Sequence, residues 1–429
     1  MTSIAYPLQE RTLENGLRVI VSEDHTAPTV AVNLWVGVGS RHEVAGRTGF
    51  AHLFEHLMFQ GSRNVASGEH FTALMNEGAR LNATTWFDRT NYFETLPSGA
   101  LDLALWLEAD RHGHLLDAVT QENLDNQRDV VKEEKRQRYD NAPYGFAMTD
   151  VYSTIFPEGH PYHHPTIGSM ADLDAATLED VHDFFRAHYG PNNTVLTLVG
   201  DVTPEAGFAA AETYFGQLPT IERVARPRLP QLAPLTSPLR VDRSEEVPND
   251  RLYIAFRLPV DATPEFHACA CAFDVIGGLS SSRLTRRLVR TDETAVGVGG
   301  WTMGLVDGVS LGAITVDVAA GADPEAVEAA VCEELEAFIA SGPDAEEMES
   351  VVADTQRSWL SALSSIEERA DLISHHALLT GDPAYINTFV DQVTALTAEQ
   401  VRDAAAAWLQ PQSRAVVRYL SAGEAEAAA

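Results

Sequence analysis

The sequence has few cysteines and no long apolar run. Its three cysteines are too few for a disulfide framework, which agrees with a reducing compartment. No segment reaches the roughly 18 to 20 consecutive apolar residues of a membrane-spanning helix. The first residues lack a basic stretch followed by an apolar one, so we expect no secretory signal. The sequence therefore predicts a cytoplasmic protein without a membrane segment.

Basic residues are also scarce. Thirty Lys and Arg stand against 62 Asp and Glu, which gives a formal net charge of -32. Such a surface repels phosphates, so nucleic acid is excluded as a partner. The excess of acidic residues either serves solubility or steers basic peptides toward a cleft, and the composition leaves both interpretations open.

The chain is too long for one core and contains an internal repeat. Its 429 residues exceed the roughly 250 to 300 that a single core supports, so we expect at least two domains. Residues 177–200 and 397–420 share Thr, Glu, Val, Asp, Ala and Pro at a constant offset of 220. Each segment predicts a helix capped by Thr, a Pro that ends it, and an apolar strand. The chain is thus predicted to contain two copies of one fold.

A cluster of five prolines predicts the boundary between the copies. These prolines lie within residues 219–238, which have the composition of an extended linker. We therefore predict an N-terminal domain at 1–218 and a C-terminal domain at 239–429. Strands and helices are mixed without strict alternation, which favours an α+β fold in both halves. The predicted strands are 17–21, 30–38, 252–258 and 310–318, and the predicted helices are 50–59, 101–111 and 121–139.

The pattern His52-Leu53-Phe54-Glu55-His56 predicts a metal site. At about 100° per residue, both histidines and Glu55 share one face of a helix. Two imidazoles at i and i+4 can bind one zinc ion, and a catalytic zinc also needs a third protein ligand and an open position for water. Glu55 can hydrogen-bond that water, so it is predicted as the general base. The alternative is that His52 and His56 are hydrogen-bonded core histidines.

The third ligand is expected on the helix predicted at 121–139. Glu133 and Glu134 are adjacent candidates, and the helical period separates them. Glu134 shares the apolar face with Val131, whereas Glu133 points about 160° away. We therefore predict Glu134 as the ligand and Gln127, on the same face, as a hydrogen-bonding residue behind the ligands.

These motifs resemble the pitrilysin family, whose inverted H-x-x-E-H helix defines the inverzincins. The family includes insulin-degrading enzyme, and the chain looks most like its two-domain bacterial processing peptidases and the β subunit of mitochondrial processing peptidase. The resemblance rests on NGLRVIV (15–21), VGVGSRHE (36–43), GFAHLFEHLMFQGS (49–62), LNATTWFDRTNYF (81–93), NQRDVVKEEKRQ (126–137) and HPYHHPTIGS (160–169). It implies one zinc ion per chain, held by His52, His56 and Glu134. Gln127 stands where the family usually has Glu.

The resemblance also implies how substrate and partner bind. The family adds peptides to a sheet edge, and the matching segment is Asn82, Ala83, Thr84 and Thr85; an ordinary edge strand is the alternative. An Arg and a Tyr seven residues apart grip the substrate in many members. Arg290 fits the Arg, but residue 297 is Gly. Members of this length close into clam-like dimers, and the missing Tyr favours a heterodimer with a metal-free homologous subunit over a homodimer.

The residues and the resemblance together predict a zinc-dependent endopeptidase. It would hydrolyse peptides or short unfolded segments with a metal-activated water and Glu55 as general base. The alternative is a peptide-binding subunit of a heterodimeric complex, either inactive or active only with its partner.

Overall fold

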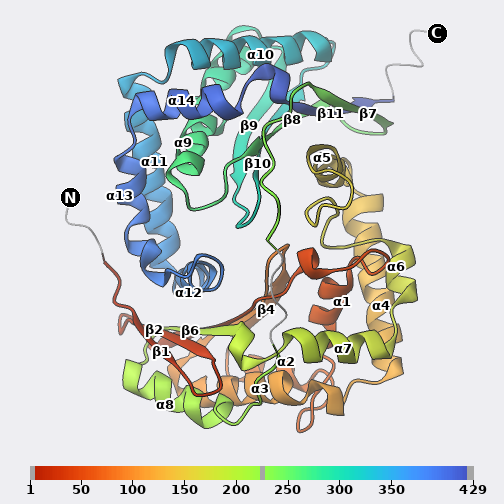
Figure 1. Cartoon of the computed structure of the whole chain (residues 1–429), viewed down its shortest axis with the longest axis vertical. Coiled ribbons are helices and arrows are strands. Elements are labelled where there is room, and N and C mark those ends of the chain that lie inside the picture. Colours follow the sequence, from red (N-terminus) through yellow and green to blue (C-terminus); the bar gives the residue numbers. More distant parts are fainter. Residues whose placement is uncertain (1–4, 223–227, 423–429) are drawn as a thin grey trace. The chain divides into compact units, whose positions relative to one another are not determined.

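The computed structural model describes residues 5–222 and 228–422, which contain two sheets with their own helices (Figure 1). These residues form two compact units. The first unit comprises the chain up to Lys135, the stretch from Pro165 into the predicted linker, and Trp359–Phe389; the second comprises the rest. The mixture of helices and sheets confirms the predicted α+β class.

The first unit is built on a six-stranded sheet of order β1-β2-β6-β3-β5-β4. Only β2 and β6 run parallel; the other neighbours are antiparallel. Every residue of β6 is buried, whereas β4 lies at the edge and pairs with β5 alone among the described strands. The strands are β1 (Gln9–Thr12), β2 (Arg18–Glu23), β3 (Thr29–Val36), β4 (Arg80–Thr85), β5 (Thr90–Pro97) and β6 (Thr194–Gly200).

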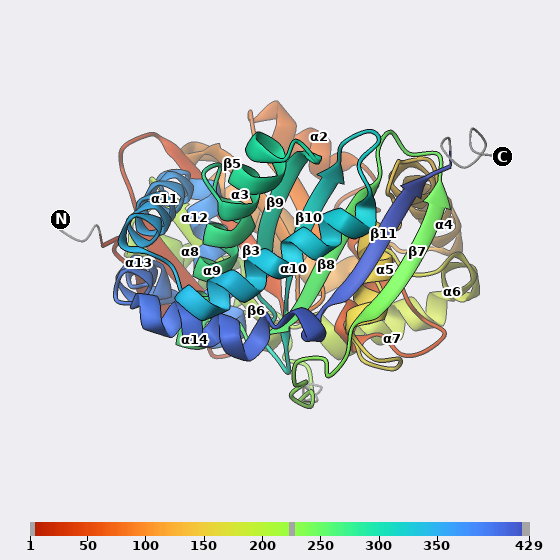
Figure 2. The ribbon, with the colours of Figure 1, turned by 90° about the horizontal axis from the view of Figure 1, so that it is seen from above.

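The second unit repeats this sheet. Its order, β7-β11-β8-β10-β9, matches β2-β6-β3-β5-β4 strand for strand, and β7 and β11 are again the parallel pair (Figure 2). The predicted duplication is therefore confirmed. The strands are β7 (Leu239–Glu245), β8 (Arg251–Leu258), β9 (Ala295–Met303), β10 (Ser310–Val318) and β11 (Ala415–Ser421).

The repeated segments have the predicted local structure. Helices α7 (Leu178–His188) and α14 (Ala398–Trp408) both begin with a capping box, in which Thr177 or Thr397 accepts from the third helical residue. Each helix ends before a proline, and β6 or β11 follows.

Each compact unit consists of segments that alternate along the sequence. The domains predicted at 1–218 and 239–429 were each one contiguous segment. Helix α12 (Ile366–His375), from the C-terminal half of the sequence, packs on β3 and β6 of the first sheet. Its Asp371 accepts hydrogen bonds from Asn33 at 3.2 Å and from Trp35 at 3.0 Å. Residues 223–227 of the predicted linker lie outside the described residues.

The second sheet is likewise covered by a helix from the N-terminal half of the sequence. Helix α5 (Ala147–Ile155) packs on β7, β8 and β11, and Figure 1 shows α10 on the opposite side of this sheet. The Asp150 carboxylate accepts two hydrogen bonds from Arg243, at 2.9 and 2.6 Å. Both sheets bury apolar residues on two faces, so helices must cover both faces of each sheet. Local sequence patterns do not show which segment of the chain supplies the helix on the second face.

The remaining helices complete the two units. None among the described residues has the length and apolar character needed to cross a membrane. In the N-terminal half they are α1 (Phe50–Leu57), α2 (Glu69–Asn76), α3 (Leu101–His114), α4 (Gln121–Lys135), α6 (Met170–Ala175) and α8 (Pro204–Phe215). In the C-terminal half they are α9 (Pro264–Phe273), α10 (Pro324–Ser341), α11 (Ala345–Ser364) and α13 (Phe389–Thr394).

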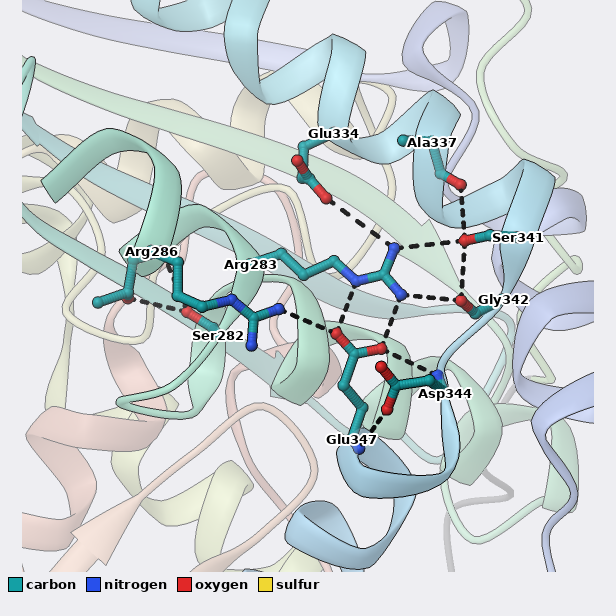
Figure 3. Close-up of polar contacts among 10 residues, drawn as sticks. Ser282, Arg283, Arg286, Glu334, Ala337, Ser341, Gly342, Asp344 and Glu347 are labelled. Atoms are coloured by element: carbon teal, nitrogen blue, oxygen red, sulfur yellow. Dashed lines mark hydrogen bonds and ion pairs between the residues drawn. The ribbon is translucent and has the colours of Figure 1, made fainter. Parts of the chain in front are cut away.

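An arginine–glutamate pair ties α10 and α11 together in the second unit (Figure 3). Arg283 donates to both carboxylate oxygens of Glu347, at 2.8 and 2.7 Å, and to the carbonyl oxygen of Gly342 at 2.8 Å. The Glu347 side chain is 11% exposed and also accepts from the backbone N–H of Asp344. This pair therefore closes the turn between the two helices.

We predict that Arg283→Met destabilises the second unit by about 3 kcal/mol, because it leaves the Glu347 carboxylate half-paired in a largely buried place. Urea unfolding measures the loss. The double variant Arg283→Met/Glu347→Met should recover part of it, since no uncompensated charge remains. A single variant as stable as the original protein would contradict this account.

A buried charged cluster lies on α3 in the first unit. The Glu108 carboxylate accepts from Arg111 and lies 3.5 Å from His70 Nε2. His112 Nδ1 lies 2.9 Å from the carbonyl oxygen of Glu108, which can only accept, so Nδ1 carries the proton. Burial, with the Arg111 charge and against the Glu108 charge, lowers the pKa of His112 to about 4. The folded protein therefore holds His112 neutral.

This low pKa predicts acid sensitivity. The unfolded chain binds a proton at His112 near pH 6.5 and the folded chain only near pH 4, so acidification between these values favours unfolding. The stability that His112 contributes above pH 6.5 is lost as the pH falls, by about 3 kcal/mol in total. In His112→Gln, denaturant unfolding between pH 6.5 and 4 should show a pH dependence smaller by that amount. An unchanged pH dependence would contradict the prediction.

Candidate metal and catalytic site

Helix α1 presents its two histidines on its less buried side. Leu53, Phe54 and Leu57 are fully buried against the core of the first unit, and they hold the helix in place. The side chains of His52 and His56 are 14% and 22% exposed. Their rings lie with centroids 4.8 Å apart, as i and i+4 positions require. The sequence pattern therefore places both imidazoles together.

The start of α1 is held by a residue that the sequence analysis did not single out. Glu43 Oε2 accepts from the backbone N–H of Gly49 at 3.0 Å, and Oε1 accepts from that of Ala51 at 2.8 Å. Gly49 has φ = 83°, and a Cβ there would lie 2.5 Å from the carbonyl oxygen of Ile167, so only glycine fits. Burial raises the pKa of Glu43 to about 8. Its place at the end of the motif VGVGSRHE was the only signal in the sequence.

Glu134 completes the metal-binding group from α4, which packs beside α1 (Figure 1). Its Oε2 lies 3.8 Å from His52 Nε2 and 3.5 Å from His56 Nε2. All three donor atoms lie within 4.8 Å of one another, and no other group of this kind occurs in residues 5–222 and 228–422. Ligands of a tetrahedral zinc ion are about 3.3 Å apart, given bonds of about 2.05 Å. The donor set and its spacing fit zinc.

The charges around this group favour a cation. Burial by itself would lower the pKa of His56, but the hydrogen bond and charge of Glu134 and the charge of Glu55 outweigh it, so the pKa is raised. Gln127, which was predicted as a hydrogen-bonding residue behind the ligands, lies within hydrogen-bonding reach of His56. A group of carboxylates around two imidazoles suits a divalent ion.

Glu133 lies on the other side of α4. It is exposed, whereas Glu134 is partly buried beside the histidines. The two side chains thus lie on the sides of α4 that the helical period predicted.

Glu55 lies beside the histidines and is held by a threonine. The residue is 8% exposed, and its Oε2 accepts from Thr85 Oγ1 at 2.5 Å. Burial raises the pKa of Glu55 above that of an ordinary glutamate, and the Thr85 hydrogen bond opposes this shift. Such a carboxylate can take a proton from water more readily than an exposed one.

The predicted peptide-binding residues Asn82, Ala83, Thr84 and Thr85 all lie on the edge strand β4, which contacts α1. The backbone N–H of Ala83 donates to Asn82 Oδ1 at 2.9 Å and not to β5. Trp86 N–H donates to Arg89 at the hairpin end, so alternate residues face outward, among them Ala83 and Thr85. The backbone groups of Ala83 and Thr85 are therefore at the open edge.

The Thr85 side chain, however, has a different position from the one a substrate contact requires. Its hydroxyl is buried and bonded to Glu55. Only its backbone can meet a peptide at the edge.

Arg290 belongs to the second unit. Its side chain is exposed, and it donates to the carbonyl oxygen of Ser280 at 2.9 Å. Residue 297, seven positions on, is a glycine of β9.

Models of one peptidase family match both halves of the chain. The family model "Insulinase (Peptidase family M16)" matches residues 18–167, and "Peptidase M16 inactive domain" matches residues 175–354. The zinc protease PqqE of Helicobacter pylori is 35% identical over 217 residues, which cover 50% of this chain and 48% of that protein. The aligned region thus spans about half the length of that relative.

Solved structures share the fold over nearly the whole chain. A protease from Helicobacter pylori matches with a TM-score of 0.90 at 25% identity and covers 97% of this chain and 100% of its own. A peptidase M16 inactive domain from Pseudomonas fluorescens matches with a TM-score of 0.85 at 18% identity, covering 97% of this chain and 98% of its own. With two consecutive family models, this shared fold and the duplicated sheets, the chain belongs to peptidase family M16, the pitrilysin or insulinase family.

Proposed function

We propose that the chain is a zinc-dependent endopeptidase that hydrolyses peptides or short unfolded segments. The observation that carries this proposal is the grouping of His52, His56 and Glu134 within 4.8 Å, with Glu55 buried beside them. Relatives named zinc proteases support the choice of metal. One ion per chain is expected, because the described residues offer one such group.

The chain's own residues divide the work of hydrolysis. His52, His56 and Glu134 would hold a zinc ion, which would supply a Lewis acid for the scissile carbonyl and for the attacking water. Glu55 takes the proton from the attacking water and passes it to the leaving nitrogen. Gln127 orients His56 from behind.

Substrate is proposed to bind as a strand along β4. The backbone groups of Ala83 and Thr85 face the open edge, and an extended peptide can bond to them whatever its side chains are. The bond between Ala83 N–H and Asn82 Oδ1 must open for this to happen. The net charge of -32 would attract basic peptides, which are therefore included among the proposed substrates, although the same charge also serves solubility.

A second candidate function is a subunit that needs a partner or is itself inactive. The match of residues 175–354 to a domain called inactive and the glycine at position 297 favour it. In this version a metal-free homologous subunit supplies the missing grip on the substrate, in a heterodimer rather than a homodimer.

One experiment separates these functions. Zinc in the purified chain is measured by atomic emission, and a peptide library is digested with the chain alone and with homologous subunits added. One zinc per chain with cleavage by the chain alone supports the endopeptidase, and cleavage only after mixing supports the dependent subunit. A chain that binds no zinc and cleaves nothing would overturn both catalytic versions.

A further inference from the structure

The buried hydroxyl of Thr85 contacts the proposed general base and not the solvent. Thr85 Oγ1 donates to Glu55 Oε2 at 2.5 Å, and both residues are at least nine-tenths buried. Thr85 Oγ1 also lies 3.5 Å from Thr90 Oγ1, whose own proton goes to the carbonyl oxygen of Val38 at 2.9 Å. An ionised carboxylate can only accept, and Glu55 Oε2 is much nearer to Thr85 Oγ1 than Thr90 Oγ1 is, so the Thr85 proton goes to Glu55.

Other buried hydroxyl groups lie next to the Thr85 hydroxyl and form hydrogen bonds with one another. Behind Thr90, Tyr189 and Tyr92 share a hydrogen bond of 2.7 Å between their hydroxyl oxygens, and Thr90 also contacts Tyr189. All of these side chains are buried within the first unit. A carboxylate held by such a network has few alternative rotamers, because each would leave a buried donor unsatisfied.

Thr85 therefore links two parts of the site. Its backbone faces the open edge of β4, where an added peptide strand would bond, and its side chain holds the carboxylate one layer inside. Of the four residues Asn82 to Thr85, it alone has a hydrogen bond to Glu55 among the described contacts.

We propose that Thr85 is a positioning residue for Glu55, which couples the edge strand to the general base, rather than a side-chain contact for the substrate. This inference rests on the proposed peptidase function for its kinetic consequence, but the position of Glu55 can be tested without any activity.

The test compares three single variants. Thr85→Val keeps the branched shape and removes the hydroxyl, and Thr85→Ser keeps the hydroxyl. Thr95→Val is the matched control, because it removes a threonine hydroxyl from the same sheet, one that donates to Glu367 and lies away from Glu55. Zinc content, kcat and KM for one peptide, and a crystal structure are measured for each.

For Thr85→Val we expect full zinc content, an unchanged KM and a kcat lowered roughly 10- to 100-fold, the effect of one lost hydrogen bond to a charged group. Thr85→Ser should recover most of kcat, and Thr95→Val should match the original protein. In the crystal structure of Thr85→Val, the Glu55 carboxylate should be displaced or disordered.

Three results would overturn the inference. They are an unchanged kcat in Thr85→Val, a change in KM alone, which would indicate a substrate contact, and an equal loss in Thr95→Val. If the original protein cleaves no peptide, the proposed function fails, and the crystal structure still decides: a Glu55 carboxylate in its original place in Thr85→Val refutes the positioning role.

Discussion

Replacing Glu55 by Gln should abolish peptide cleavage and leave zinc bound. The amide keeps the size of the side chain and can still accept from Thr85, but it cannot take a proton from water. General acid–base groups contribute roughly 10²- to 10⁴-fold, so we expect kcat to fall about 10³-fold. Zinc per chain, measured by atomic emission, should be the same as in the original protein.

His52→Ala is the companion variant for this prediction. It removes a ligand, so zinc and activity should both be lost, whereas Glu55→Gln separates them. Undiminished turnover in Glu55→Gln would refute the proposed role of this carboxylate and leave only the metal-binding part of the site.

Replacing Glu134 by Gln should weaken zinc binding by roughly 100-fold or more. Glu134 Oε2 lies 3.8 and 3.5 Å from the two imidazole Nε2 atoms, and an amide oxygen carries no charge to offset the ion. The expected loss exceeds the 10- to 100-fold that residues behind the ligands typically contribute. Competition against a zinc-binding dye measures the dissociation constant.

Glu133→Gln is the matched control. It removes the same charge from the adjacent residue, which is exposed on the other side of α4. Its zinc dissociation constant should stay within about two-fold of the original, because charges exposed to water are strongly screened. Equal weakening in both variants would mean that general charge, and not coordination by Glu134, controls zinc binding.

Local sequence patterns were sufficient for much of the fold. The Thr caps of α7 and α14 and the apolar runs of β8 and β10 appear where the sequence predicted them. These features depend on residues within a few positions of one another, and the side chain has the same role wherever the element lies.

The domain division predicted from the sequence differs from the compact units because local patterns do not show which segments pack together. Helix α12 covers the first sheet although its residues lie far along the chain, and Asp371 bonds to Asn33 and Trp35 across more than 300 positions. An amphipathic helix shows in its sequence that one face is buried, but not which apolar surface buries it. Which surface buries the helix is decided by the packing of the whole fold.

The sequence by itself determined which residues were predicted as the metal ligands and the general base. The spacing of His52, Glu55 and His56 places three functional groups on one helical face, and the same period distinguishes Glu134 from Glu133. Only the tertiary structure brought α4 beside α1, placed the Glu43 carboxylate at the start of α1, and turned the Thr85 hydroxyl toward Glu55. The physical reason is that helical periodicity acts over a few residues, whereas these contacts join segments whose approach depends on packing the entire core.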